Sequence, residues 1–146
     1  MVPAAHTPRT TDRPGYLLKR AQTALHVALA AALRGPGASV AQYAVLTALD
    51  EEPGLSNADL ARRAFVTPQT MNEVLRELEG KHWVTRHPHP GHGRILQASL
   101  TLPGRAALAA CHQAVAAIEE QMLTRLSPAQ RDQLTAALHA CIDALS

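Results

Sequence analysis

The stretch from Leu55 to Thr101 constrains the fold of this 146-residue chain more than any other part of it. Ser56 to Ala64 has the composition of a short helix, and a break at Phe65–Val66 separates it from a second predicted helix, Thr67 to Glu79. Two strand-like runs with a polar loop between them follow at once. The order helix, tight turn, helix, hairpin is that of a winged helix-turn-helix.

Capping residues mark the start of both predicted helices. Ser56 can accept from the free amides of the first turn, and Asp59 three residues later completes a pattern close to a capping box. Thr67 repeats this role, and Pro68 falls at the first helical position, where its missing N–H costs nothing. Because both helices have defined starts, the turn between them must be short.

The second predicted helix has two contrasting faces. An apolar stripe at i, i+3, i+4 and i+7 is formed by Met71, Val74, Leu75 and Leu78. The opposite face is polar and is formed by Gln69, Asn72, Glu73 and Arg76, with Thr70 at its margin. Gln and Asn can bind adenine and Arg can bind guanine in the major groove, whereas any solvated helix face is also polar. The position of this helix, second in a pair and followed by a hairpin, favours DNA recognition.

The hairpin has the features of a wing. Trp83 to Arg86 has strand character, Leu96 to Leu100 alternates apolar and polar residues, and His87 to Arg94 is a Pro- and Gly-punctuated loop. An exposed loop Arg beside a groove-reading helix suggests a contact with the DNA backbone or minor groove. Leu55 is expected to add a short strand to this hairpin.

Five segments carry a resemblance to a known family: Gln42–Leu46, Leu60–Arg63, Val66–Thr70, Leu75–Glu79 and Ser99–Arg105. In this order and at these spacings they resemble the MarR family of bacterial transcription regulators, from about Gly15 to Leu145. The resemblance implies a mainly α fold with a small β-wing, dimerising through N- and C-terminal helices. It also implies a regulator, usually a repressor, that binds palindromic operators until a small ligand or oxidant releases it.

By the same resemblance, one set of side chains would face the major groove and Arg94 would reach the minor groove. The major-groove set is Thr67, Pro68, Gln69, Thr70, Asn72, Glu73 and Arg76. Two departures from the family pattern affect this expectation. His92 stands where the family usually has an Asp that orients the wing Arg. Phe65 stands where the family usually has Gly, so an unusual backbone angle or a reshaped turn is expected there.

Charge is unevenly distributed along the chain. The net charge of the whole chain is only +2, yet between Gly54 and Arg105 seven Lys or Arg stand against four Asp or Glu, a net +3. Positive charge therefore collects on the predicted reading unit, as phosphate neutralisation requires. Apolar residues make up 47% and aromatic residues 3%, which with abundant Ala favours packed helices.

The organisation along the chain follows from these patterns. Residues 1–13 are expected to be a disordered arm, and residues 14–146 one domain. Its winged lobe covers about residues 40–101, between terminal helices at about 15–34 and 102–146, with a second capping box at Ser127 and Gln130. The terminal helices are too apolar for the small lobe alone, so we expect a twofold homodimer. No signal peptide or membrane span is visible, and a cytoplasmic location is expected.

Four wing histidines, His82, His87, His89 and His92, raise the hypothesis of a metal switch. The loop offers no Cys or acid, so exposed side chains that attract phosphate once protonated are the preferred interpretation, and no metal or cofactor is expected. Cys111 and Cys141 could sense oxidants, but neither has an obvious activating base besides His112, and buried small apolar residues are the preferred interpretation.

An effector pocket between the first helix and the lobe has Lys19, Arg20, His26 and Tyr43 as candidate linings, and the sequence does not choose among ligands. No catalytic residues are expected, because the chain lacks a nucleophile elbow, a phosphate loop and a strong metal-spaced motif. Two alternatives stay open: a module that binds protein through the lobe without DNA, and a redox- or metal-responsive regulator.

Overall fold

The computed structural model describes residues 7–146, apart from the side chains of residues 89 and 92–96. Six α-helices, one 3-10 helix (η1) and two strands lie in this part of the chain. In chain order they are η1 (Thr10–Asp12), α1 (Pro14–Leu33), α2 (Val40–Glu51), α3 (Asn57–Arg63), α4 (Pro68–Gly80), β1 (Val84–His89), β2 (His92–Leu100), α5 (Leu102–Leu123) and α6 (Pro128–Leu145).

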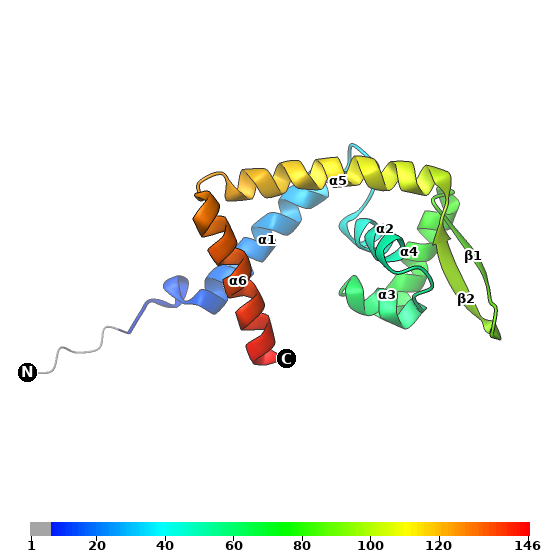
Figure 1. The fold of residues 1–146 in the computed structure, drawn as a ribbon, viewed down its shortest axis with the longest axis horizontal. Coiled ribbons are helices and arrows are strands. Elements are labelled where there is room, and N and C mark those ends of the chain that lie inside the picture. Colours follow the sequence, from blue (N-terminus) through cyan, green and yellow to red (C-terminus); the bar gives the residue numbers. More distant parts are fainter. Residues whose placement is uncertain (1–6) are drawn as a thin grey trace, which may run out of the picture.

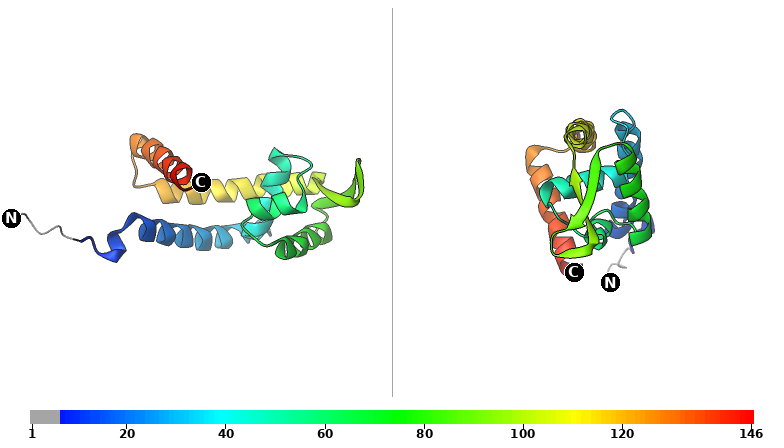
Figure 2. Two further views of the ribbon diagram at one scale, coloured as in Figure 1. Left: turned by 90° about the horizontal axis from the view of Figure 1, so that it is seen from below. Right: turned by 90° about the vertical axis from the view of Figure 1, so that its right-hand side faces the viewer.

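Helix α5 spans the molecule and joins its two ends (Figure 1). At one end α2, α3, α4 and the hairpin form the winged lobe; at the other, α6 folds back from the end of α5. Helix α1 runs alongside α5, as the left view of Figure 2 shows. The predicted fold class, mainly α with a small β-wing, is confirmed.

The lobe has its own core, contributed by every one of its elements and by α5. Its fully buried side chains include Leu46 of α2, Leu60 of α3, Leu78 of α4 and Val84 of β1. A second buried cluster joins Leu33, Ala38, Cys111 and Val115 where α1 and α5 meet. The lobe therefore packs as a unit and rests on the α1–α5 pair.

Side-chain caps begin five of the helices, because each is preceded by a Ser or Thr whose oxygen accepts from the third backbone amide. The capping box expected at Ser127 and Gln130 is present. Another, formed by Ser39 and Gln42, starts α2 and was missed, although its Ser-x-x-Gln pattern is visible in the sequence.

The hairpin is longer than predicted. Strand β1 continues to His89 and β2 begins at His92, so the expected loop from His87 to Arg94 shrinks to Pro90 and Gly91. Pro88 carries a local loop signal in the sequence, but it pairs with Leu96 in a two-stranded sheet, where a residue without an N–H can be tolerated. A register irregularity follows it. The polar loop prediction was therefore wrong in extent.

Leu55 forms no strand. The sheet within residues 7–146 contains β1 and β2 alone, and the segment before α3 meets it through a side chain, since Gln97 Nε2 donates to the carbonyl of Gly54 at 3.3 Å. Of the arm predicted at residues 1–13, the first six residues lie outside the described part, and Thr10–Asp12 forms the 3-10 helix η1.

The junction of hairpin and α5 depends on close backbone approach at Gly104. A Cβ on this residue would lie 2.0 Å from the carbonyl oxygen of Trp83, so only Gly fits. The Thr101 amide donates to the same carbonyl at 3.0 Å, and the Thr101 hydroxyl donates to the carbonyl of His82 at 2.6 Å. The lobe is thereby fixed to the start of α5.

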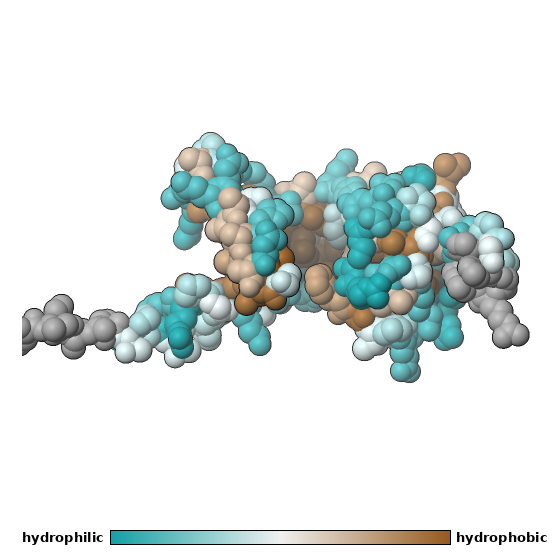
Figure 3. Space-filling view, turned by 60° about the horizontal axis from the view of Figure 1, so that its bottom comes forward, coloured by the Kyte–Doolittle hydropathy of each residue, from teal (hydrophilic) through white to brown (hydrophobic). Residues whose placement is uncertain are grey.

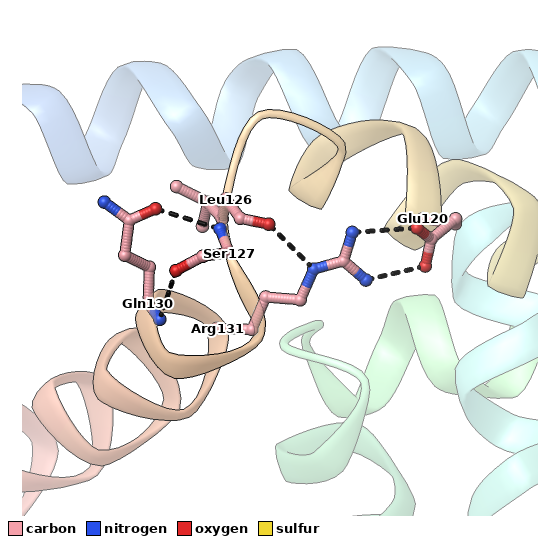
Figure 4. A network of polar contacts seen from close by, with 5 residues as sticks. All are labelled: Glu120, Leu126, Ser127, Gln130 and Arg131. Atoms are coloured by element: carbon pink, nitrogen blue, oxygen red, sulfur yellow. Dashed lines mark hydrogen bonds and ion pairs between the residues drawn. The ribbon is translucent and has the colours of Figure 1, made fainter.

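The corner between α5 and α6 is held by one arginine (Figure 4). Arg131 donates two hydrogen bonds, of 2.9 and 2.8 Å, to the carboxylate of Glu120, and its Nε donates to the carbonyl of Leu126 at 3.3 Å. This bidentate pair lowers the pKa of Glu120. The geometry fixes the direction in which α6 leaves α5.

The α1–α6 end of the molecule exposes large apolar side chains. Figure 3 shows apolar residues gathered there, while the outer surface of the lobe is mostly hydrophilic. No residue of α6 is buried, and its apolar positions include Leu134, Leu138, Ile142 and Leu145. Within residues 7–146, none of the helices combines the length and the hydropathy of a membrane span.

Candidate nucleic-acid interface

Helix α4 has one buried and one exposed face, as its sequence pattern predicts. Met71, Val74, Leu75 and Leu78 are buried in the lobe core. The exposed residues include the whole predicted reading set, Thr67, Pro68, Gln69, Thr70, Asn72, Glu73 and Arg76. The buried apolar face therefore anchors α4 in the lobe, and its polar face points toward solvent. This arrangement is needed to present side chains to base edges.

The N-terminus of α4 is tied to α3. The Thr67 hydroxyl accepts from the Thr70 amide at 3.1 Å and lies 3.0 Å from the Thr70 hydroxyl. Asn57, at the start of α3, donates from Nδ2 to the carbonyl of Pro68 at 3.4 Å. These contacts fix the angle between the two helices at the end of α4 where a recognition helix approaches DNA.

The turn between α3 and α4 contains the unusual backbone angle expected at Phe65, whose φ is 56°. The amide of Val66 reaches back to the carbonyl of Ala61 at 3.0 Å, the long bond of a Schellman helix end. That motif needs a left-handed residue, normally Gly, at the position that Phe65 occupies. The prediction is confirmed, and the Phe65 side chain is 96% exposed.

Most of the positive charge on the lobe is neutralised within the chain. Arg62 pairs with Asp59, Arg63 with Glu51, Arg86 with Glu79, and Arg105 with Asp50. Among the described side chains, none forms an ion pair or hydrogen bond with Arg76. The net charge of +3 between Gly54 and Arg105 thus overstates the positive charge that is not already paired within the chain. Arg76 is the arginine of α4 available to a ligand.

Several side chains near the tip of the wing lie outside the described residues. The backbone of Arg94 lies in β2, but its side chain is outside the described residues, as are those of His89 and His92. His87 is exposed and lies 3.5 Å from the Ser99 hydroxyl through Nε2. Within the described side chains no three His, Cys, Asp or Glu cluster as metal ligands do.

The four candidate effector residues do not share one site. Lys19 and Arg20 line a pocket of about 550 Å³ on α1. His26 lines another, of about 680 Å³, between α1 and the start of α2. Tyr43 joins α2 to α5 instead: its hydroxyl lies 2.9 Å from Nδ1 of His112, and burial raises the pKa of the Tyr43 phenol.

The His26 pocket is connected to α4 by a polar network that the sequence did not reveal. Lys81, which follows α4, donates from Nζ to the carbonyl of Gly37 at 2.5 Å and to Oε1 of Gln42 at 2.8 Å. Gln42 in turn donates to Glu77 of α4 at 2.7 Å. Lys81, Gln42 and Arg34 all line the pocket, so basic and amide groups form part of its wall.

The two cysteines differ. Cys111 is buried, and burial raises the pKa of its thiol, which disfavours the reactive thiolate. Cys141 is exposed on α6, so its predicted burial is wrong for the single chain. Its place on the apolar stripe of α6, with Leu138 and Leu145, explains why the sequence pattern indicated burial.

Comparisons with known proteins agree with this geometry. The model of the MarR family matches residues 37–95. The HTH-type transcriptional repressor Rv2887 of Mycobacterium tuberculosis is 43% identical over 123 residues, covering 83% of this chain and 88% of the relative.

Solved structures of that MarR family protein resemble the present fold. Its complex with DNA has a TM-score of 0.75 at 36% identity, covering 88% of this chain and 97% of the other. Its complex with salicylic acid has a TM-score of 0.75 at 39% identity, covering 88% and 96%. The matches extend well beyond the helix-turn-helix and include the terminal helices. The chain therefore belongs to the MarR family of winged helix-turn-helix transcription regulators.

Proposed function

We propose that this protein is a transcription repressor that binds a palindromic operator as a homodimer and is released by a small molecule. The observation that carries the proposal is the two-faced α4, with Gln69, Asn72 and Arg76 exposed over a fully buried apolar back. Thr67, Pro68, Thr70 and Glu73 would complete its contact with the major groove, and Arg94 would reach the minor groove. The proposal assigns the protein no catalytic step and places it in the cytoplasm, with the DNA.

The exposed apolar residues of α1 and α6 support the homodimer. Leu17, Leu18 and Val27 of α1 and Ile142 and Leu145 of α6 are between 45% and 91% exposed in the single chain. An apolar surface of this extent is stabilised by a second copy. Twofold symmetry would then set two α4 helices about 34–36 Å apart, one turn of DNA.

The His26 pocket supports release by an anionic ligand. A carboxylate bound between His26, Arg34 and Lys81 would compete with the Gly37 and Gln42 oxygens for the Lys81 ammonium. Lys81 follows α4 directly, so its displacement would alter how the end of α4 rests on α2. The related Rv2887 has been solved with salicylic acid, an anion of this class.

A footprint on the DNA flanking the coding region tests the proposal. We expect a protected palindrome with half-sites about one helical turn apart, and salicylate should reduce the protection. Arg34→Met removes a cation that lines the pocket and leaves the Lys81 contacts in place, so it should keep the footprint and require more salicylate to lose it. Lys19→Met, in the other α1 pocket, serves as the matched control. A footprint unchanged by every anion tried would contradict ligand release, and no footprint would contradict the function.

A further inference from the structure

Phe65 is unfavourable for the folded chain in two independent ways. Its φ of 56° lies in the left-handed region, which costs every residue with a Cβ more than it costs Gly. Its ring is 96% exposed, so it gains no burial within the chain. Backbone strain at a position whose side chain is not packed within the chain points to a contact made outside the chain.

The conformation itself is imposed by the end of α3. Ala64 closes the helix with a bond to Leu60 at 2.9 Å, and Val66 turns inward against the lobe core. The residue between them must be left-handed and must point its side chain outward. Gly would satisfy this turn at lower cost, so the ring is not explained by the fold.

The position of the ring points to duplex DNA. Phe65 lies two residues before Thr67, the N-cap of α4, and the Asn57–Pro68 bond holds this end of α4 against α3. Arg62, one helical turn earlier, keeps 73% of its side chain exposed although it pairs with Asp59. Aromatic rings contact thymine methyls in the major groove, and the deoxyribose offers a similar apolar surface.

We infer that the ring of Phe65 makes an apolar contact with the operator, at a thymine methyl or a deoxyribose beside the N-terminus of α4. The inference rests on the proposed function. A second protein copy is the less favoured occupant, because the exposed apolar residues of α1 and α6 lie at the other end of α5 (Figure 1) and Phe65 belongs to the lobe.

Two variants separate the ring from the strain. Phe65→Gly removes both, so we expect a Tm about 2–4 °C higher together with roughly tenfold weaker operator binding. Phe65→Ala removes the ring and keeps the strain, so the same loss of affinity should appear without the gain in Tm. Leu102→Ala removes another large apolar side chain that is 83% exposed and should leave affinity unchanged.

Binding is measured by fluorescence anisotropy on the footprinted operator, with each thymine replaced in turn by deoxyuridine. If deoxyuridine at one position weakens binding by the wild type but not by Phe65→Gly, the ring contacts the methyl of that thymine. If Phe65→Gly binds more weakly than the wild type and no such position exists, the ring contacts a deoxyribose. If Phe65→Gly binds the operator with the same affinity as the wild type, the inference is overturned. This includes the outcome in which the variant changes the monomer–dimer equilibrium alone. A wild type that binds no duplex overturns the proposed function itself.

Discussion

The side-chain amide of Gln42 donates a hydrogen bond of 2.7 Å to the carboxylate of Glu77, which ties the first turn of α2 to the last turns of α4. Gln42 is only 5% exposed, although its partners Glu77 and Lys81 lie closer to solvent. A buried amide with three polar partners therefore connects α2 to the C-terminal end of α4.

Replacing Gln42 with Ala should destabilise the protein by about 2 kcal/mol, because it leaves partly buried polar groups without their partner. Gln130→Ala is the matched control, since Gln130 occupies the same capping-box position on exposed α6. Its cost should be about 0.5 kcal/mol. Urea unfolding of both variants measures the difference, and equal losses would show that the α2–α4 network contributes little.

Gly104→Ala should cost about 3 kcal/mol or prevent folding, because the new methyl would meet the backbone of Trp83 at 2.0 Å. Gly80→Ala provides the comparison, since nothing lies within 4 Å of a Cβ at that helical position. It should be neutral or stabilising by up to about 0.5 kcal/mol. Thermal unfolding followed by circular dichroism distinguishes them. An unchanged Tm in Gly104→Ala would contradict the described junction.

The thiols should report on dimer formation. Cys111 is buried in the chain and should label slowly with Ellman's reagent at every protein concentration. Cys141 lies on the exposed apolar stripe of α6, so its labelling should accelerate on dilution as the dimer dissociates. Cys141→Ser identifies the faster thiol. Rapid labelling of Cys111, or a Cys141 rate independent of concentration, would be inconsistent with this arrangement.

The Glu120–Arg131 pair should make stability depend on pH. Hydrogen bonding from Arg131 lowers the pKa of Glu120 in the folded state, so the unfolded chain binds the proton more readily. The stabilisation from this ion pair should be fully present above the ordinary Glu pKa of about 4.3. It should be lost as the pH falls through the lower pKa of Glu120 in the folded state.

Glu120→Gln should therefore be less stable than the wild type at pH 7 and approach it in acid. Glu119→Gln is the control, because within the described residues Glu119 forms no hydrogen bond or ion pair. Chemical unfolding at a series of pH values gives both differences. A gap between Glu120→Gln and the wild type that does not change with pH would exclude the pair as its source.

Local signals made the helices predictable. Ser56, Thr67 and Ser127 act through neighbours three residues away, so their caps could be located from the sequence. The unusual backbone angle at Phe65 was also predictable, because the family that the chain resembles usually has Gly at this position. The extent of the hairpin was not predictable from the sequence. Pro88 is compatible both with a loop and with a strand of a two-stranded sheet, so it does not mark where β1 ends.

The polar network depends on chain segments far apart, and this is why it was missed. Gln42 and Glu77 are 35 residues apart, and Lys81 reaches Gly37 across 44 residues. Nothing in either segment alone indicates the pairing. The free charge of the lobe was overestimated for the same reason, because Arg63 and Arg105 find their acids in α2. The DNA contacts of α4 and Arg94 stay predictions.

Operator affinity as a function of salt, for wild type and Arg76→Ala, tests the central claim most directly. Wild-type affinity should fall roughly a thousandfold or more between about 50 and 200 mM salt. Arg76→Ala should lose about tenfold of its preference for the operator over a scrambled duplex. Arg125→Ala, at an exposed position in the turn after α5 and far from the lobe, should retain that preference. Salt-independent binding, or equal operator preference in wild type and Arg76→Ala, would contradict recognition of DNA by the exposed face of α4.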